Sequence, residues 1–118
     1  MLQHGNIKEG IKFIQRNIRE NENIYIYHFA IPGYEYYDSI GFTNIKARIF
    51  KGIYNRHGIY SSGDINEIND LHGKTWLLFS HTFADEKFMI NYIDSFGYTK
   101  IKEFKTVDSS AYLYDFGE

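Results

Sequence analysis

The stretch KTWLLFSHTFADEKF, residues 74–88, decides the fold because it joins an apolar run directly to the start of a helix. Trp76–Phe79 is apolar without interruption, which is typical of a strand buried on both faces of a sheet. The run ends on Ser80 and His81, and a helical hydrophobic period follows over residues 84–96. The stretch therefore predicts a central strand that leads through a short loop into a helix.

On either side of this stretch the hydrophobic period changes several times. Isoleucines spaced like one helical face predict a helix over residues 6–20. The β-forming run Ile24–Ala30 predicts a second buried strand, which Pro32 is expected to end. The remaining periods predict helices over 34–40 and 64–72 and strands over 44–50, 100–106 and 110–116.

The predicted order of elements is α, β, α, β, α, β, α, β, β. Alternation of this kind favours an α/β fold, here a three-layer sandwich with a mainly parallel sheet and helices on both faces. The last two strands are joined by the turn residues 107–110, so we expect a C-terminal antiparallel hairpin at the edge of the sheet.

Composition predicts one soluble domain over residues 1–118. Hydrophobic residues make up 43% and charged residues 24% of the chain, a balance typical of folded soluble domains. The net charge of -2 disfavours a nucleic-acid partner, because such binders usually carry a strong basic excess. The chain has no cysteine, which excludes disulfides, thiolate metal sites and a cysteine nucleophile. No apolar run is long enough to span a bilayer, and the first residues do not resemble a signal peptide.

Ser80 and His81 are the first candidates for catalysis, because loops after parallel strands are where α/β proteins bind ligands. Neighbouring residues of a strand point to opposite faces, however, so the two side chains are poorly placed to serve each other. No G-x-S-x-G motif surrounds Ser80. The acids Asp85 and Glu86 are explained by the dipole at the start of a helix. The sequence therefore predicts no catalytic residue, and a strand end with a local hydrogen-bonding role is the favoured interpretation.

Metal and cofactor sites also lack a motif. The five histidines form no H-x-H or H-x-x-x-H pattern, and no glycine-rich phosphate loop is present. A metal site assembled from His28, His81 and a carboxylate in the folded protein stays open as an alternative. The basic loop around Arg56 could meet an anion, although a solvated loop is the default. We therefore expect no metal and no cofactor.

Taken as a string, the chain resembles a specific family. Six segments occur in this order: IYIYHFAIPGYEYY, IKARIFKG, DINEINDLHG, KTWLLFSH, DEKFMINYID and YLYDF. Their order resembles that in the soluble C-terminal domain of GT-C type membrane glycosyltransferases, the dolichyl-phosphate-mannose mannosyltransferase and ArnT-like group. The resemblance covers about residues 7–116, and WLLFSH before YLYDF is its most specific part. The matching positions are Tyr27, Pro32, Tyr36, Tyr37, Gly52, Trp76, Ser80, His81, Glu86, Asp94, Gly97, Tyr112, Tyr114 and Asp115. One departure is Thr75, which stands where the family usually has a basic residue before Trp76.

The resemblance implies a part of an enzyme rather than a whole one. Members of this family transfer a sugar from a polyprenyl-phosphate donor, and their catalytic acid lies between transmembrane helices. The resemblance therefore implies a non-catalytic accessory domain on the extracytoplasmic face, with the transmembrane portion of a glycosyltransferase as partner and carbohydrate or lipid-linked sugar as possible contacts. It carries over no catalytic residue to this chain.

Two other functions stay open. A stand-alone α/β module could bind a small ligand at the carboxyl ends of the strands at 24–30 and 74–80, and a small hydrolase could use His81. Aromatic faces beside polar loops suit contact with sugars. The candidate ligand contacts are His81, Ser80, Tyr27, Tyr36 and Arg56.

Overall fold

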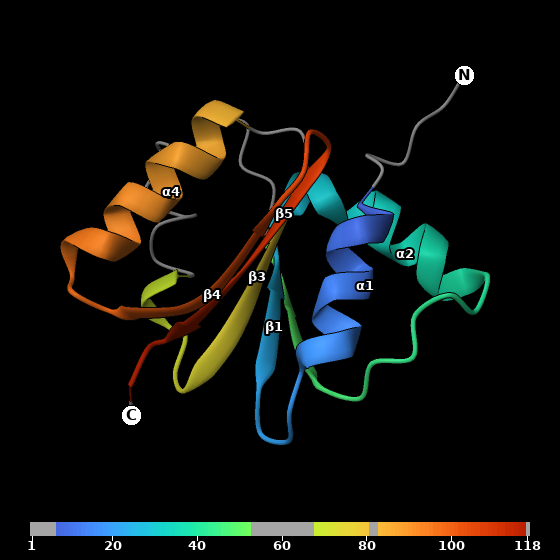
Figure 1. Ribbon diagram of the computed structural model, residues 1–118, viewed down its shortest axis with the longest axis horizontal. Coiled ribbons are helices and arrows are strands. Elements are labelled where there is room, and N and C mark those ends of the chain that lie inside the picture. Colours follow the sequence, from blue (N-terminus) through green and yellow to red (C-terminus); the bar gives the residue numbers. More distant parts are fainter. Residues whose placement is uncertain (1–6, 53–67, 81–82, 118) are drawn as a thin grey trace.

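A computed structural model of the chain describes residues 7–52, 68–80 and 83–117. The described part is an α/β fold built on a five-stranded sheet (Figure 1). The elements are the helices α1 (Lys8–Asn17), α2 (Ile31–Ser39) and α4 (Phe83–Ser95), the 3₁₀ turn η1 (His28–Ala30), and the strands β1 (Asn23–Ile26), β2 (Arg48–Lys51), β3 (Lys74–Ser80), β4 (Thr99–Lys105) and β5 (Ser109–Asp115). Within these residues, no helix has the length and apolar character needed to cross a lipid bilayer.

The sheet is mixed, which corrects the prediction of a mainly parallel sheet. Its strand order is β2-β1-β3-β5-β4. β1 pairs in parallel with β2 and β3, whereas β5 pairs antiparallel with β3 and β4. The predicted C-terminal hairpin is present, but its second strand inserts between β3 and β4 instead of both strands extending the edge.

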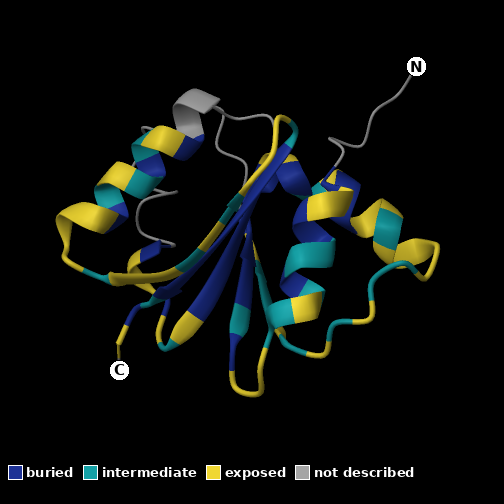
Figure 2. Ribbon diagram, viewed as in Figure 1, coloured by how far each residue is buried: buried dark blue, intermediate teal, exposed yellow. Residues whose placement is uncertain are grey.

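The burial of the two hairpin strands explains this order. Six of the seven residues of β5 are buried, so this strand requires neighbours on both sides and cover on both faces. In β4, charged lysine and glutamate residues are interspersed with two apolar residues. The strand is mostly exposed, which suits an edge strand. Figure 2 shows the contrast between the buried central strands and the exposed edge.

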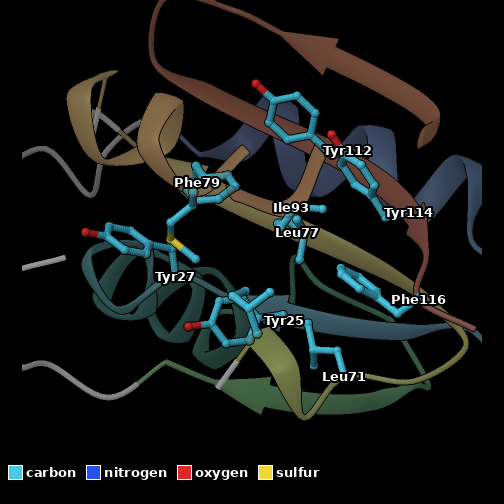
Figure 3. Packing of buried hydrophobic residues seen from close by; sticks show 11 residues of the cluster. Tyr25, Tyr27, Leu71, Leu77, Phe79, Ile93, Tyr112, Tyr114 and Phe116 are labelled. Carbon is cyan, nitrogen blue, oxygen red and sulfur yellow. The ribbon is translucent and has the colours of Figure 1, made fainter. Parts of the chain in front are cut away.

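Helices lie on both faces of the sheet (Figure 1), and each face has its own hydrophobic core. α1 contributes Ile11 and Ile14 to the core that contains Trp76 on β3. α4 contributes Met89 and Ile93 to the opposite core. This second core is rich in aromatic rings from neighbouring strands (Figure 3), namely Tyr25, Tyr27, Phe79, Tyr112, Tyr114 and Phe116.

The strand predicted over Ile24–Ala30 is too long. β1 ends at Ile26, and η1 follows and runs directly into α2. Pro32 does not break a strand but lies in the first turn of α2, where its fixed φ is already helical and its missing N–H has no intrahelical partner to lose. Tyr27 and Ala30 after Ile26 are buried by tertiary packing, which periodicity does not distinguish from a strand, whereas Phe29 is 53% exposed.

Other predicted boundaries need smaller corrections. α1 spans residues 8–17 instead of 6–20, because the backbone is already extended at Ile18. β2 spans 48–51 instead of 44–50. The prediction that α2 and α4 end at a glycine is confirmed. Gly41 and Gly97, just after these helices, adopt φ values of +81° and +78°. Of the helix predicted over 64–72, only the part from residue 68 lies within the described residues.

Candidate functional site

The carboxyl ends of β1 and β3 form the position where open α/β sheets commonly bind ligands. The chain leaves β1 towards β2 on one side, while β3 lies on the other side, so the strand order switches between them. Tyr27 and His28 follow β1, and Ser80 ends β3. The sequence placed three of its candidate contacts here, namely Tyr27, Ser80 and His81.

The two described candidates at this position belong to the protein interior. Ser80 is 4% exposed, and its hydroxyl donates a hydrogen bond to the backbone carbonyl of Phe29 over 3.2 Å. Tyr27 is fully buried and its ring lies 5.4 Å from that of Phe79. Both side chains therefore join the segment after β1 to the end of β3, the local structural role that was favoured for Ser80.

Of the other three candidates, the structure describes Tyr36, and it does not lie beside Ser80. Tyr36 lies on α2, is 41% exposed and packs edge-on against Tyr37 at 5.1 Å between ring centroids. His81 and Arg56 lie outside the described residues.

The most specific polar arrangement links β5 to α4. The Tyr112 hydroxyl donates a short hydrogen bond to Glu86 Oε2, and the Tyr114 hydroxyl donates one to Asp94 Oδ1 over 2.7 Å. Glu86 is only 8% exposed, so its charge lies in the core beside a donor. The helix dipole accounts for an acid at this position but not for its burial. The sequence contained a signal for these pairs, since two tyrosines on one face of a strand require polar partners when buried.

Both tyrosines are held in their neutral form. Burial raises the pKa of Tyr112, and the hydrogen bond to Glu86 raises it further. Burial likewise raises the pKa of Tyr114, with a second contribution from the hydrogen bond to Asp94. The hydroxyls therefore act as stable donors that fix α4 on the sheet.

A cavity of about 420 Å³ opens beside the first of these pairs. It lies between residues 86–91 of α4 and the turn that joins β4 to β5. Its lining consists of Glu86, Lys87, Ile90, Asn91, Lys105, Thr106, Ser110 and Tyr112. Ser109, which begins β5, pairs with Ser80, so the cavity lies at the same end of the sheet as the carboxyl ends of β1 and β3. Its volume falls in the usual range for small-molecule sites.

A second buried acid lies on the other side of the sheet. Glu22 Oε1 accepts a hydrogen bond from the indole Nε1 of Trp76 and another from the backbone N of Arg19, both over 2.9 Å. With these two donors the carboxylate, which is 7% exposed, ties the turn before β1 to β3.

Within the described part of the chain, no group of three or more histidine, aspartate and glutamate side chains gathers as it would around a metal ion. No family model matches the sequence, and no curated protein or solved structure matches it either.

Proposed function

We propose that this chain is a non-catalytic accessory domain of a polyprenyl-phosphate-sugar-dependent membrane glycosyltransferase of the GT-C type. It would lie on the extracytoplasmic face, beside the transmembrane portion of that enzyme, and assist acceptor access or support the membrane part. The proposal begins from the resemblance of residues 7–116 to the C-terminal domain of such enzymes.

The observation that carries the proposal is what the residues of the resemblance do in the fold. Glu86 bonds to Tyr112 and Asp94 bonds to Tyr114, so four of these positions form two pairs inside the domain. Catalytic groups must reach a substrate, whereas these side chains hold α4 on β5. A shared pattern of this kind supports a scaffold that accompanies an enzyme and carries no chemistry of its own.

The further details of the fold belong to the same proposal. We infer a three-layer sandwich, supported by the two hydrophobic cores on opposite faces of the sheet. In this arrangement the edge strands β2 and β4 stay available to a membrane partner.

A transfer assay tests the proposal. The domain alone, mixed with a polyprenyl-phosphate sugar in detergent and with candidate acceptors, is expected to transfer no sugar, because the resemblance places the catalytic acid in the membrane part. A polytopic polypeptide encoded beside this sequence should be active, and removal of the domain should reduce its acceptor use. Transfer by the domain alone would overturn the non-catalytic assignment.

A free-standing binding module is the second candidate, and the cavity beside α4 is the observation that favours it. Fluorescence of Trp76 is a poor reporter of binding there, because its ring is fully buried in the opposite core. Backbone amide NMR shifts of α4 and β5 are the better measurement. The hydrolase alternative depends on His81, which lies outside the described residues. Unchanged turnover in His81→Ala would remove His81 from any mechanism.

A further inference from the structure

We propose that the cavity between α4 and the β4–β5 turn binds a phosphomonoester, with Lys87 and Lys105 holding the phosphate from opposite walls. Lys87 belongs to α4 and Lys105 ends β4, and both line the cavity. The proposal does not rest on the glycosyltransferase assignment, because a free-standing module could use the same site.

The first argument is that the positive charge of these two lysines is not neutralised by the described residues. Three of the described lysines have carboxylate partners, as in Lys51–Glu35 at 2.8 Å. Glu103 would be the nearest carboxylate to Lys105 along β4, but it is bonded to Lys100 at 2.6 Å. Within the described side chains, neither Lys87 nor Lys105 has a carboxylate within 4.0 Å of its ammonium group, the limit that defines an ion pair.

The second argument concerns the one acid in the cavity wall. Glu86 turns its Oε2 towards Tyr112, which donates to it and stays protonated. This hydrogen bond satisfies one oxygen of the carboxylate. The negative charge is thereby held in the wall, while the two ammonium groups are carried by exposed residues at the rim.

The two lysines favour a phosphate over a carboxylate as the bound group. A phosphomonoester carries close to two negative charges near neutral pH and three acceptor oxygens, so it can meet two ammonium groups at once. Asn91 also lines the cavity, and its side-chain amide can donate to a further oxygen or to a ligand hydroxyl. Thr106 serves the turn instead, since its hydroxyl donates to the carbonyl of Ser109 and accepts from two backbone N–H groups.

The organic part of the ligand has two possible sources. Ile90 provides an apolar patch inside the cavity, and Val107, which is 80% exposed, projects from the turn beside Lys105. A small phosphorylated metabolite would use Ile90 alone, whereas a lipid with a phosphomonoester head group would also place Val107 against the bilayer surface. The phosphate chemistry is the same in both cases.

Titration of the isotope-labelled domain tests the proposal. Glycerol 3-phosphate is expected to shift the amide signals of Lys87, Asn91 and Ser110 in a saturable way, and glycerol is expected to leave them unchanged. Flotation with phosphatidylcholine vesicles, with and without phosphatidic acid, distinguishes the sources. Binding to glycerol 3-phosphate alone assigns a soluble ester, and binding that requires phosphatidic acid assigns a lipid head group.

Two variants locate the site. Lys105→Gln and Lys87→Gln should each weaken binding about tenfold, the usual loss for one hydrogen bond to a charged group. Lys102→Gln is the matched control, since Lys102 lies on the same strand but pairs with Leu113, whose side chain faces the opposite core. Both Lys87 and Lys105 are exposed, so the folded spectrum should be retained.

The proposal is overturned if neither glycerol 3-phosphate nor phosphatidic acid binds, or if Lys102→Gln weakens binding as much as Lys105→Gln does. It is also overturned if glycerol produces the same shifts as its phosphate ester, because the phosphate would then contribute nothing.

Discussion

At the scale of single residues, the Tyr112 and Glu86 pair is the most consequential polar contact. Replacement by Tyr112→Phe removes the donor and leaves the Glu86 carboxylate in the core without it. We expect the free energy of unfolding to fall by about 1–3 kcal/mol, the usual cost of an unsatisfied buried group. Urea denaturation followed by circular dichroism measures the change.

The matched control is Tyr92→Phe, because Tyr92 bonds to Asn69 over 3.2 Å at an exposed position. Water replaces that bond, so its loss should cost less than about 1 kcal/mol. Equal losses for the two variants would show that the pair between Tyr112 and Glu86 does not stabilise the fold.

The same tyrosines predict how stability depends on alkaline pH. The pKa of Tyr112 and that of Tyr114 lie above the ordinary tyrosine value of 10.0, so the unfolded chain loses these protons first. Stability is therefore full below pH 10.0 and decreases as the pH rises above it. The maximum slope is about 1.4 kcal/mol per pH unit for each tyrosine.

Unfolding experiments between about pH 8 and pH 11 test this dependence, since tyrosine titrates near pH 10. Tyr112→Phe should be less stable than the parent at neutral pH but should lose stability less steeply in alkali. Parallel curves for the two proteins would contradict a raised pKa for Tyr112 in the folded state.

At the scale of elements, the contact between β1 and the residue after β2 depends on a glycine. The N–H of Gly52 donates to the carbonyl of Ile26 over 2.8 Å, and a Cβ at this position would lie 3.0 Å from His28 N and 3.2 Å from Ile26 O. These are backbone atoms, which move only if the end of β1 moves. Gly52→Ala should therefore destabilise the domain by about 1–3 kcal/mol.

Thermal unfolding checks this prediction, with Lys51→Ala as the neighbouring control. Lys51 is half exposed, and its ion pair with Glu35 should contribute less than about 1 kcal/mol. A Gly52→Ala domain as stable as the parent would mean that β1 and the residue after β2 can separate without cost.

Local patterns predicted the strand at Lys74–Ser80, the helix after it and the final hairpin, because each has a clear period and a marked end. They did not predict that the strand after Ile26 would give way to a helical turn, since burial there comes from tertiary contacts. The insertion of β5 between β3 and β4 follows from its burial on both faces, which the apolar run YLY only hints at. The pairing of Glu86 with Tyr112 joins residues 26 positions apart and depends on how α4 lies on the sheet.

Candidate contacts were predicted less well than elements. Ser80 and Tyr27 were selected for their position at a strand end. Both side chains are buried there, and the Ser80 hydroxyl donates to the carbonyl of Phe29. The cavity beside α4 combines residues of a helix with those of a hairpin turn, so no spacing in the sequence brings them together. Ser80 pairs with Ser109 and so lies at the same end of the sheet as this cavity.

At the scale of the whole molecule, helices cover both faces of the sheet in the described part of the chain, so neither face is open to solvent (Figure 1). Within the described residues, what the domain offers a partner is therefore its edge strands β2 and β4 and the cavity beside α4. This arrangement suits an accessory domain that contacts a larger enzyme through one end of its sheet.

The central claim is that the domain works beside a membrane enzyme, and its location in the cell tests this most directly. An antibody raised against the folded domain can be applied to fractionated source cells. We expect the antigen to sediment with membranes and, after detergent extraction, to run with a polypeptide that has many membrane-spanning segments. An antigen of domain size found only in the aqueous fraction would contradict the account.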